Sequence, residues 1–228
     1  MVTIPNPWLS IKPTDAIKMA DGDKAILQSF VSNNVSALKD WPEPYMGNPN
    51  ASVYFLNGNP YLGDTPNAPL YDNLMQHNLM HQSVNGYNPF VFFNDIIVNG
   101  KLLGGCEWWQ KRTKKLQEEL GHLPNIFVVE YFPYRTDVAK DIPNQKILAN
   151  TPSYKYANQL IYEAMNAGKL IVIMRMANLW LQRIPQLTTY PNMLRLINSQ
   201  NISITEGNVY EKGCSAWHRL TGMLKKYP

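Results

Sequence analysis

The sequence predicts an α/β domain: a three-layer αβα sandwich in which helices cover both faces of a four-stranded, mainly parallel sheet. Four short apolar runs typical of buried strands alternate along the chain with longer segments of helical periodicity. Apolar residues make up 45% of the 228 residues, which is enough for a substantial core. No repeat, low-complexity tract or clear linker interrupts the sequence, so we expect one domain over residues 1–228.

Residues 1–40 are expected to form an N-terminal extension that packs on this domain. Residues 1–13 are rich in proline and should run extended over the surface. The segment Asp23–Asn33 places its apolar residues on one helical face. Trp41–Pro49 is predicted to be a rigid, aromatic-rich loop that leads into the first strand, because two of its prolines flank a single residue and hold it extended.

The first strand, Val53–Leu56, runs directly into the polar turn Asn57-Gly58-Asn59-Pro60. Gly58 can adopt positive φ, and the two asparagine side chains can bond to local backbone. Ligands of open α/β sheets bind beyond the carboxyl ends of the strands, which makes this turn a candidate site. An ordinary strand-to-helix turn is the alternative interpretation.

Tyr71–Ser83 is expected to be a helix, and it carries His77 and His81 at positions i and i+4. This spacing can place two imidazoles on one metal ion, but no third ligand is nearby, so we expect no metal site. The later run Pro89–Phe93 is either a short buried segment or a loop that presents an aromatic ring to a ligand. Burial is the favoured interpretation.

An amphipathic helix is predicted for Glu107–Leu120, with Trp109 on its buried face and Gly121 as its C-terminal cap. Its four lysine and arginine residues could contact phosphates or could form a solvated face that Glu118 and Glu119 partly neutralise. The solvated face is the commoner arrangement.

A second buried strand is predicted for Ile126–Phe132, and it contains Glu130. An acid in so apolar a run is either paired or hydrogen-bonded, or its pKa is raised. Arg135 is one conceivable partner. A perturbed carboxyl near a strand end is a candidate functional group, whereas alternation along the strand could instead turn it outward at a sheet edge.

The remaining elements complete the alternation of helices and strands. In chain order they are a helix at Ser153–Ala167 with Ser153 as N-cap, a strand at Leu170–Met174, a short helix through Trp180, a strand at Leu194–Ile197 and a helix at Val209–Tyr227. Arg175 stands at the carboxyl end of the third strand. Asn198-Ser199-Gln200-Asn201 is a second polar cluster that follows a strand.

The composition limits the possible partners only loosely. A net charge of +4, with 17% charged residues, permits a DNA or nucleotide partner but does not demand one. Cys106 and Cys214 lie far apart and fit free thiols in a reducing cytoplasm. We expect no signal peptide, no membrane span and no cofactor, and the sequence leaves the oligomeric state open.

Four of these segments resemble motifs of the uracil-DNA glycosylase superfamily, over about residues 40–210. Asn57-Gly58-Asn59-Pro60-Tyr61, preceded by Pro42–Pro49, is similar to the first motif: a Gly, a variable residue, Asp or Asn, Pro, then Tyr or Gly. The other matches are Glu130–Tyr134, the strand that ends in Arg175 with Trp180 after it, and Asn198–Asn208.

The resemblance implies a four-stranded parallel sheet with helices on both faces, and it assigns roles to these positions. Asn59 would position the attacking water, Tyr61 would line the base pocket, and Phe90 or Phe92 would stack on a flipped base. Glu130 stands where several families have an Asn that reads the base edge. Asn57, Gly58, Tyr134 and Arg175 would complete the substrate site.

The last motif of the family normally begins His-Pro-Ser, whereas this chain has Asn198-Ser199-Gln200. Asn198 or Gln200 would offer the leaving base only a neutral hydrogen bond, which stabilises an anion less. A carboxylate at Glu130 suits a base with a donor edge, such as an exocyclic amine.

We therefore expect a glycosylase-like protein that binds a nucleobase at the carboxyl ends of the strands. Hydrolysis of an N-glycosidic bond in DNA is the expected activity, with Asn59 and Asn198 as its catalytic residues. The alternatives are a nucleotide- or nucleic-acid-binding module without chemistry and a protein-interaction module. All versions of the resemblance require Asn59, Glu130 and Asn198 to converge at the carboxyl edge of one sheet.

Overall fold

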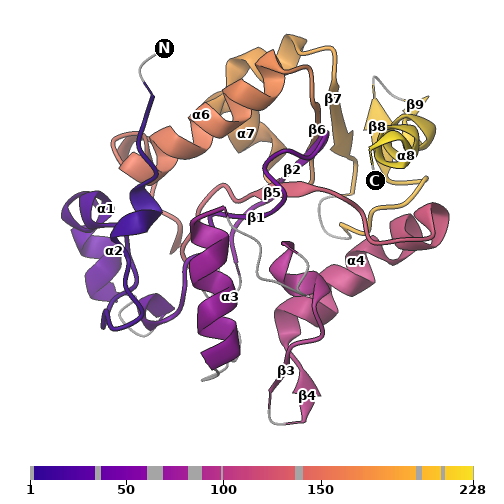
Figure 1. Cartoon of the computed structure of the whole chain (residues 1–228). Coiled ribbons are helices and arrows are strands. Elements are labelled where there is room, and N and C mark those ends of the chain that lie inside the picture. The colour runs from indigo at the N-terminus through magenta and orange to yellow at the C-terminus, as the bar shows by residue number, and fades with distance from the viewer. Residues whose placement is uncertain are drawn as a thin grey trace.

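The structure is a computed structural model that describes residues 3–33, 37–60, 69–81, 89–98, 100–136, 141–198, 202–211 and 214–227. Its centre is a mixed seven-stranded sheet with helices on both faces (Figure 1). The predicted α/β class is confirmed, but the sheet has seven strands where the sequence predicted four. None of the described helices is long and apolar enough to cross a membrane.

Nine strands are found in the described residues. They are β1 (Tyr45–Gly47), β2 (Val53–Leu56), β3 (Ile97–Val98), β4 (Lys101–Leu102), β5 (Phe127–Val129), β6 (Leu170–Ile173), β7 (Met193–Leu196), β8 (Val209–Glu211) and β9 (Cys214–Ser215). The large sheet has the order β1-β5-β2-β6-β7-β8-β9, and β3 and β4 form a separate hairpin.

The helices of the described residues form layers above and below this sheet. The α-helices are α1 (Asp21–Ile26), α2 (Gln28–Asn33), α3 (Pro69–Leu79), α4 (Gly104–Leu120), α5 (Gln145–Leu148), α6 (Pro152–Asn166), α7 (Ala177–Arg183) and α8 (Trp217–Lys226). Short 3-10 helices occur at Pro7–Ser10, Ala37–Lys39, Val91–Phe93 and Pro185–Thr189. Figure 1 shows α6 and α7 on one side of the sheet and α3 and α4 on the other, where α8 contacts α4 and β2.

The four strands predicted from the sequence, β2, β5, β6 and β7, form the parallel centre of the sheet. Each is a short apolar run, as expected of strands that helices cover on both faces. Every residue of β2, β5 and β6 is buried. Because the four strands are parallel, the segments that follow them all leave from one edge of the sheet. The candidate residues after these strands therefore share that edge.

Antiparallel strands, which the sequence analysis missed, extend this centre on both sides. β1 pairs with β5 inside the segment Trp41–Pro49, which was predicted to be a loop. β8 pairs with β7, and β9 pairs with β8. The prediction of one helix over Val209–Tyr227 is wrong, because Val209 and Tyr210 pair with Leu196 and Arg195 before α8 begins.

Two helix boundaries also differ from the prediction. The single helix predicted for Asp23–Asn33 is divided into α1 and α2 at Leu27. The N-cap of α6 is Thr151, whose side chain accepts a hydrogen bond from the Tyr154 N–H, and Ser153 lies inside the helix.

The N-terminal segment contributes to the core as well as covering it. Trp8, expected on the surface, is 2% exposed and meets the Tyr134 ring edge-on at 5.8 Å. The Tyr134 hydroxyl donates to Asp23 Oδ2 at 2.8 Å and accepts from the Ala20 N–H at 3.3 Å. This network anchors α1 to the segment that follows β5.

Candidate functional site

A cavity of about 310 Å³ opens at the carboxyl edge of the parallel strands. Its polar lining includes Asn57 and Asn59 after β2, Glu130 after β5 and Arg175 after β6. The opposite lining comes from Phe92 and from the start of α4. Its size is at the lower end of ordinary small-molecule sites, and its position is where open α/β sheets bind ligands.

Backbone hydrogen bonds fix the floor of the cavity beyond the strand ends. The Asn57 N–H donates to the Val129 carbonyl at 2.9 Å, and the Phe132 N–H donates to the Gly58 carbonyl at 2.9 Å. The indole N–H of Trp180 donates to the Asn57 carbonyl at 2.7 Å. The turn after β2 and the segment after β5 are therefore held in one arrangement before any ligand enters.

Glu130 is a buried acid of the cavity floor whose pKa is strongly raised. Its side chain is 3% exposed, and Oε1 accepts a hydrogen bond from Asn57 Nδ2 at 2.8 Å. Burial, opposed by the Asn57 hydrogen bond, aided by the charge of Glu43 and opposed by that of Arg175, raises the pKa of Glu130 to about 8. The alternative that Glu130 faces outward at a sheet edge is excluded, because β5 lies between β1 and β2.

Two buried oxygen atoms of the lining have no hydrogen-bond partner among the described residues. They are Asn57 Oδ1 and Glu130 Oε2, the atoms of each side chain that the Asn57–Glu130 hydrogen bond does not use. Asn57 is 4% exposed. Buried polar groups of folded proteins are almost always hydrogen-bonded, so such a pair at a cavity is open to the polar groups of a ligand or to ordered water.

Arg135 does not pair with Glu130, contrary to the sequence-based suggestion. Its Nη2 donates to Glu43 Oε1 in a buried salt bridge and to the Tyr71 hydroxyl at 2.8 Å. Burial raises the pKa of Glu43, and the Arg135 guanidinium opposes that rise. Arg135 is thus engaged by Glu43, and Glu130 Oε2 stays without a partner among the described residues.

Aromatic rings form the wall opposite Glu130. Phe92, Trp108 and Trp109 line the cavity, and the two tryptophan rings meet edge-on with centroids 4.9 Å apart. Gly105 lies against the Phe92 ring so closely that a methyl group there would come within 2.7 Å of the ring. Glycine at this position therefore allows Phe92 to reach the wall. Flat aromatic walls suit a planar ligand.

Phe90, the predicted stacking residue, is not part of the cavity lining. Its ring is 1% exposed and meets Trp109 edge-on, with centroids 5.0 Å apart, so it supports the wall from behind. Phe92, the other residue predicted to stack on a base, does line the cavity. The favoured burial of the Pro89–Phe93 run is confirmed.

Arg175 brings a positive charge to the same cavity. Its guanidinium forms no hydrogen bond or salt bridge within the part of the chain that the structure describes. The next residue, Met176, has the left-handed backbone conformation with φ of 54°, which is uncommon for a non-glycine residue. A Cβ on Gly58 would lie in ordinary van der Waals contact with both Arg175 and Met176, so the turn passes close beside these side chains.

Asn59 lines the cavity with an oriented amide. Its Nδ2 donates to Thr136 Oγ1 at 2.7 Å and to the Pro60 carbonyl at 3.1 Å. Both donor hydrogens are thereby engaged, and Oδ1 remains as an acceptor. This atom can hold a water molecule at the cavity wall.

Other predicted site residues lie elsewhere. Asn198 follows β7 at the same edge but is exposed, does not line the cavity, and donates its backbone N–H to Asn208 Oδ1 at 2.8 Å. Tyr134 is buried against Asp23, away from the cavity. Tyr61 and Gln200 lie outside the described residues. Asn59 and Glu130 thus meet in one cavity, whereas Asn198 shares only the sheet edge.

The sequence analysis missed the contribution of α4. Gly104, Gly105 and Trp108 line the cavity at the N-terminal end of this helix. Trp109 was assigned to the buried face, and it is both 3% exposed and part of the cavity wall. The available signal was a pair of adjacent glycines followed, after two intervening residues, by a pair of adjacent tryptophans. The basic residues of α4 are partly neutralised on the helix itself, since Lys111 pairs with Glu107 and Lys115 pairs with Glu118.

The histidine pair does not form a helical metal motif. α3 ends at Leu79, and His81 lies beyond it with φ of 56°. The His81 ring stacks on Tyr45 with centroids 4.2 Å apart, and its Nε2 is hydrogen-bonded to the Tyr156 hydroxyl at 2.8 Å. No group of three or more His, Cys, Asp or Glu residues within the described ranges is arranged to hold a metal ion.

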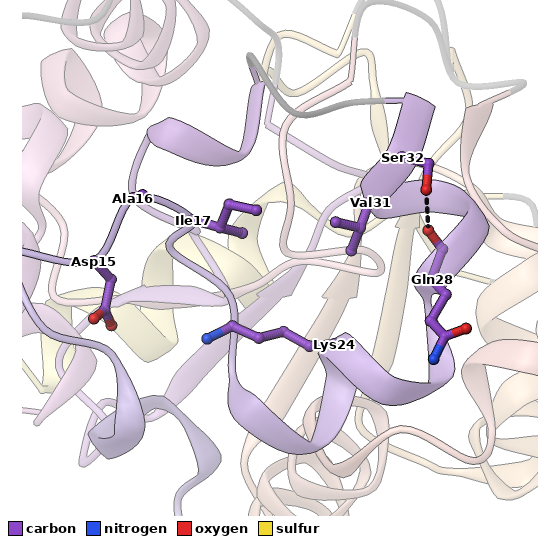
Figure 2. Close-up of a pocket in the computed structure, with 7 residues that line it drawn as sticks. All are labelled: Asp15, Ala16, Ile17, Lys24, Gln28, Val31 and Ser32. Carbon is purple, nitrogen blue, oxygen red and sulfur yellow. Dashed lines mark hydrogen bonds between the residues drawn. The ribbon is translucent and has the colours of Figure 1, made fainter.

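A second, more open depression of about 580 Å³ lies on the N-terminal helices, with Ile17, Lys24 and Val31 in its lining (Figure 2). Lys24 is paired with Asp21 at 2.9 Å. The hydrogen bond drawn in Figure 2, from the Ser32 hydroxyl to the Gln28 carbonyl, belongs to α2 itself. None of its described lining residues has a buried polar atom without a partner, so it lacks the ligand signal of the first cavity.

Comparison of this chain with models of protein families, with curated proteins and with solved structures gives no match. What the cavity binds must therefore be inferred from its own residues.

Proposed function

We propose that this chain is a glycosylase-like protein that binds a nucleobase in the cavity at the carboxyl ends of β2, β5 and β6. The observation that carries the proposal is the pair of buried polar atoms, Asn57 Oδ1 and Glu130 Oε2, in a cavity with an aromatic wall. A nucleobase is planar, and its edge carries the hydrogen-bonding groups that such a pair requires.

Shape and charge support this assignment. A base entering the cavity would lie against Phe92 and Trp108 and would turn its edge toward Asn57 and Glu130. Stacking on aromatic rings contributes about 1–3 kcal/mol per base in single-strand-binding proteins. Arg175 stands beside the polar floor, where its cationic guanidinium suits a phosphate or other anionic group of a nucleotide.

The reaction we propose is hydrolysis of an N-glycosidic bond, with the base in DNA turned out of the helix into the cavity. Asn59 would hold the attacking water through Oδ1, since Thr136 and Pro60 fix its amide. The water oxygen bonds to C1′ of the sugar while the C1′–N bond breaks and its electrons leave with the base. The proton that the water loses neutralises the released base, so the products are the C1′ hydroxyl and the free base. The four central parallel strands and the glycosylase-like turn Asn57–Pro60 support this version.

A second candidate function is binding of a base or nucleotide without chemistry. It is favoured by the position of Asn198, which is exposed and outside the cavity, so that the described residues offer no donor from the last motif to a departing base. An interaction module that uses the glycosylase scaffold for a protein partner would also fit a disused last motif.

A glycosylase assay distinguishes these functions. Single- and double-stranded oligonucleotides with uracil, hypoxanthine, xanthine or oxidised bases are incubated with the wild-type chain and with Asn59→Ala. Cleavage that is lost in Asn59→Ala establishes the hydrolase, and Asn150→Ala, an exposed asparagine outside the cavity, is the matched control. Binding of these bases without cleavage would support the second candidate. The absence of both binding and cleavage would refute the nucleobase proposal.

A further inference from the structure

The chemistry of the cavity floor is determined by where one proton lies. Asn57 Oδ1 is an amide oxygen and can only accept a hydrogen bond. The Nδ2 of the same side chain donates to Glu130 Oε1. Glu130 Oε1 is therefore the accepting oxygen of the carboxyl group. A proton on Glu130 would lie on Oε2, the oxygen that has no partner among the described residues.

Two charged groups act on this carboxyl from the elements around it. Glu43, before β1, opposes ionisation of Glu130, and Arg175, after β6, favours it. Arg135, after β5, is engaged by Glu43 in the buried salt bridge. Burial outweighs these charges and raises the pKa of Glu130 to about 8, so the carboxyl group is mainly protonated at about pH 7.

The two free atoms then form a complementary pair, one acceptor and one donor. Resting on the proposed nucleobase function, we propose that the cavity selects a neutral base with an N–H beside an acceptor atom, and that Asn57 Oδ1 binds the N–H while the Glu130 carboxylic acid donates to the acceptor. Cytosine and adenine have this edge, because the N–H of the exocyclic amine lies beside an unprotonated ring nitrogen.

Ionisation of Glu130 would remove the hydrogen-bond donor from the pair and weaken the binding of such a base. Two acceptors would then face the ring nitrogen and the amine, and one buried acceptor would oppose another. Loss of the Glu130 proton should therefore weaken cytosine binding in proportion to the protonated fraction that remains. Glu130 thus determines which base edge the cavity binds, and its role can be measured through the pH dependence of cytosine affinity.

The test is a titration of the full chain with free cytosine, followed by NMR, at about pH 6.5 and about pH 9. With a pKa of about 8, roughly one tenth of Glu130 stays protonated at about pH 9, so the apparent affinity should fall about tenfold. Glu130→Gln carries a permanent donor in place of the acid, and its ratio of affinities at the two pH values should be about one. N4,N4-dimethylcytosine, which lacks the N–H, should bind more weakly than cytosine to both chains.

Equal affinity of the wild-type chain at both pH values, or a tenfold ratio that persists in Glu130→Gln, would overturn this inference while leaving nucleobase binding intact. If no base binds at either pH, the proposed function itself fails. A measurement without variants follows the ¹³C signal of the Glu130 carboxyl group. Its titration midpoint should lie near pH 8 and move upward when cytosine saturates the cavity, and a midpoint near the ordinary value of 4.5 would also overturn the inference.

Discussion

Replacing Glu130 with glutamine should remove a pH-dependent loss of stability from the fold. Burial raises the pKa of Glu130 from 4.5 to about 8, so between these values the folded chain holds a proton that the unfolded chain has released. The stability that this proton contributes is complete below about pH 4.5 and is lost as the pH rises through about 8. Over this span, at about 1.4 kcal/mol per pH unit, the wild-type chain should lose about 5 kcal/mol that Glu130→Gln keeps.

Urea unfolding at about pH 5, 6.5 and 8 measures this loss as the difference in unfolding free energy between the two chains. Burial also raises the pKa of Asp23 and of Glu43, but both groups are present in each chain and largely cancel in the difference. Glu206→Gln makes the same change at an exposed position and provides the control. A difference between wild type and Glu130→Gln that stays constant with pH would refute the reasoning.

Three further substitutions test the surroundings of the cavity. Trp180→Phe removes the donor to the buried Asn57 carbonyl and should cost about 1–3 kcal/mol in urea unfolding; an unchanged stability would show that this bond does not hold the floor. Arg183→Lys cannot reproduce the three hydrogen bonds to Asn158, Tyr131 and Tyr154 and should cost at least about 2 kcal/mol by thermal unfolding; an unchanged stability would show that these bonds do not hold the segment. Gly105→Ala should crowd Phe92, lower stability by about 1–3 kcal/mol and weaken base binding, whereas Gly104→Ala, whose added methyl meets no atom within 4 Å, should keep or slightly raise stability; similar losses in both would contradict the geometry.

The central strands could be predicted from the sequence because each is a continuous apolar run between polar turns. The flanking strands could not be predicted in the same way. β1 follows two prolines and is only three residues long, which resembles an extended loop until β5 is placed beside it. Val209–Glu211 continues into a helical pattern, and only its pairing with β7 reveals a strand. Short edge strands are determined by a partner that is distant in sequence.

Part of the site could be predicted because its residues directly follow strands. Asn57, Asn59 and Glu130 were found from the rule that ligands bind beyond the carboxyl ends of parallel strands. The aromatic wall depends on where the N-terminal end of α4 lies relative to that edge, which local sequence does not determine. A tryptophan that faces a cavity and one that fills a core have the same sequence pattern, and Trp109 does both.

The antiparallel strands at the two ends of the sheet affect how copies of this chain can associate. Each of the apolar parallel strands has neighbours on both sides, so their backbone groups are not available to another molecule. Among the described residues, the edge strands of the sheet are instead β1, with three buried residues, and β9, with two residues. Such short edges are poor templates for strand addition. The short edge strands thus protect the sheet from edge-to-edge aggregation. Self-association of this chain would have to use the helical faces.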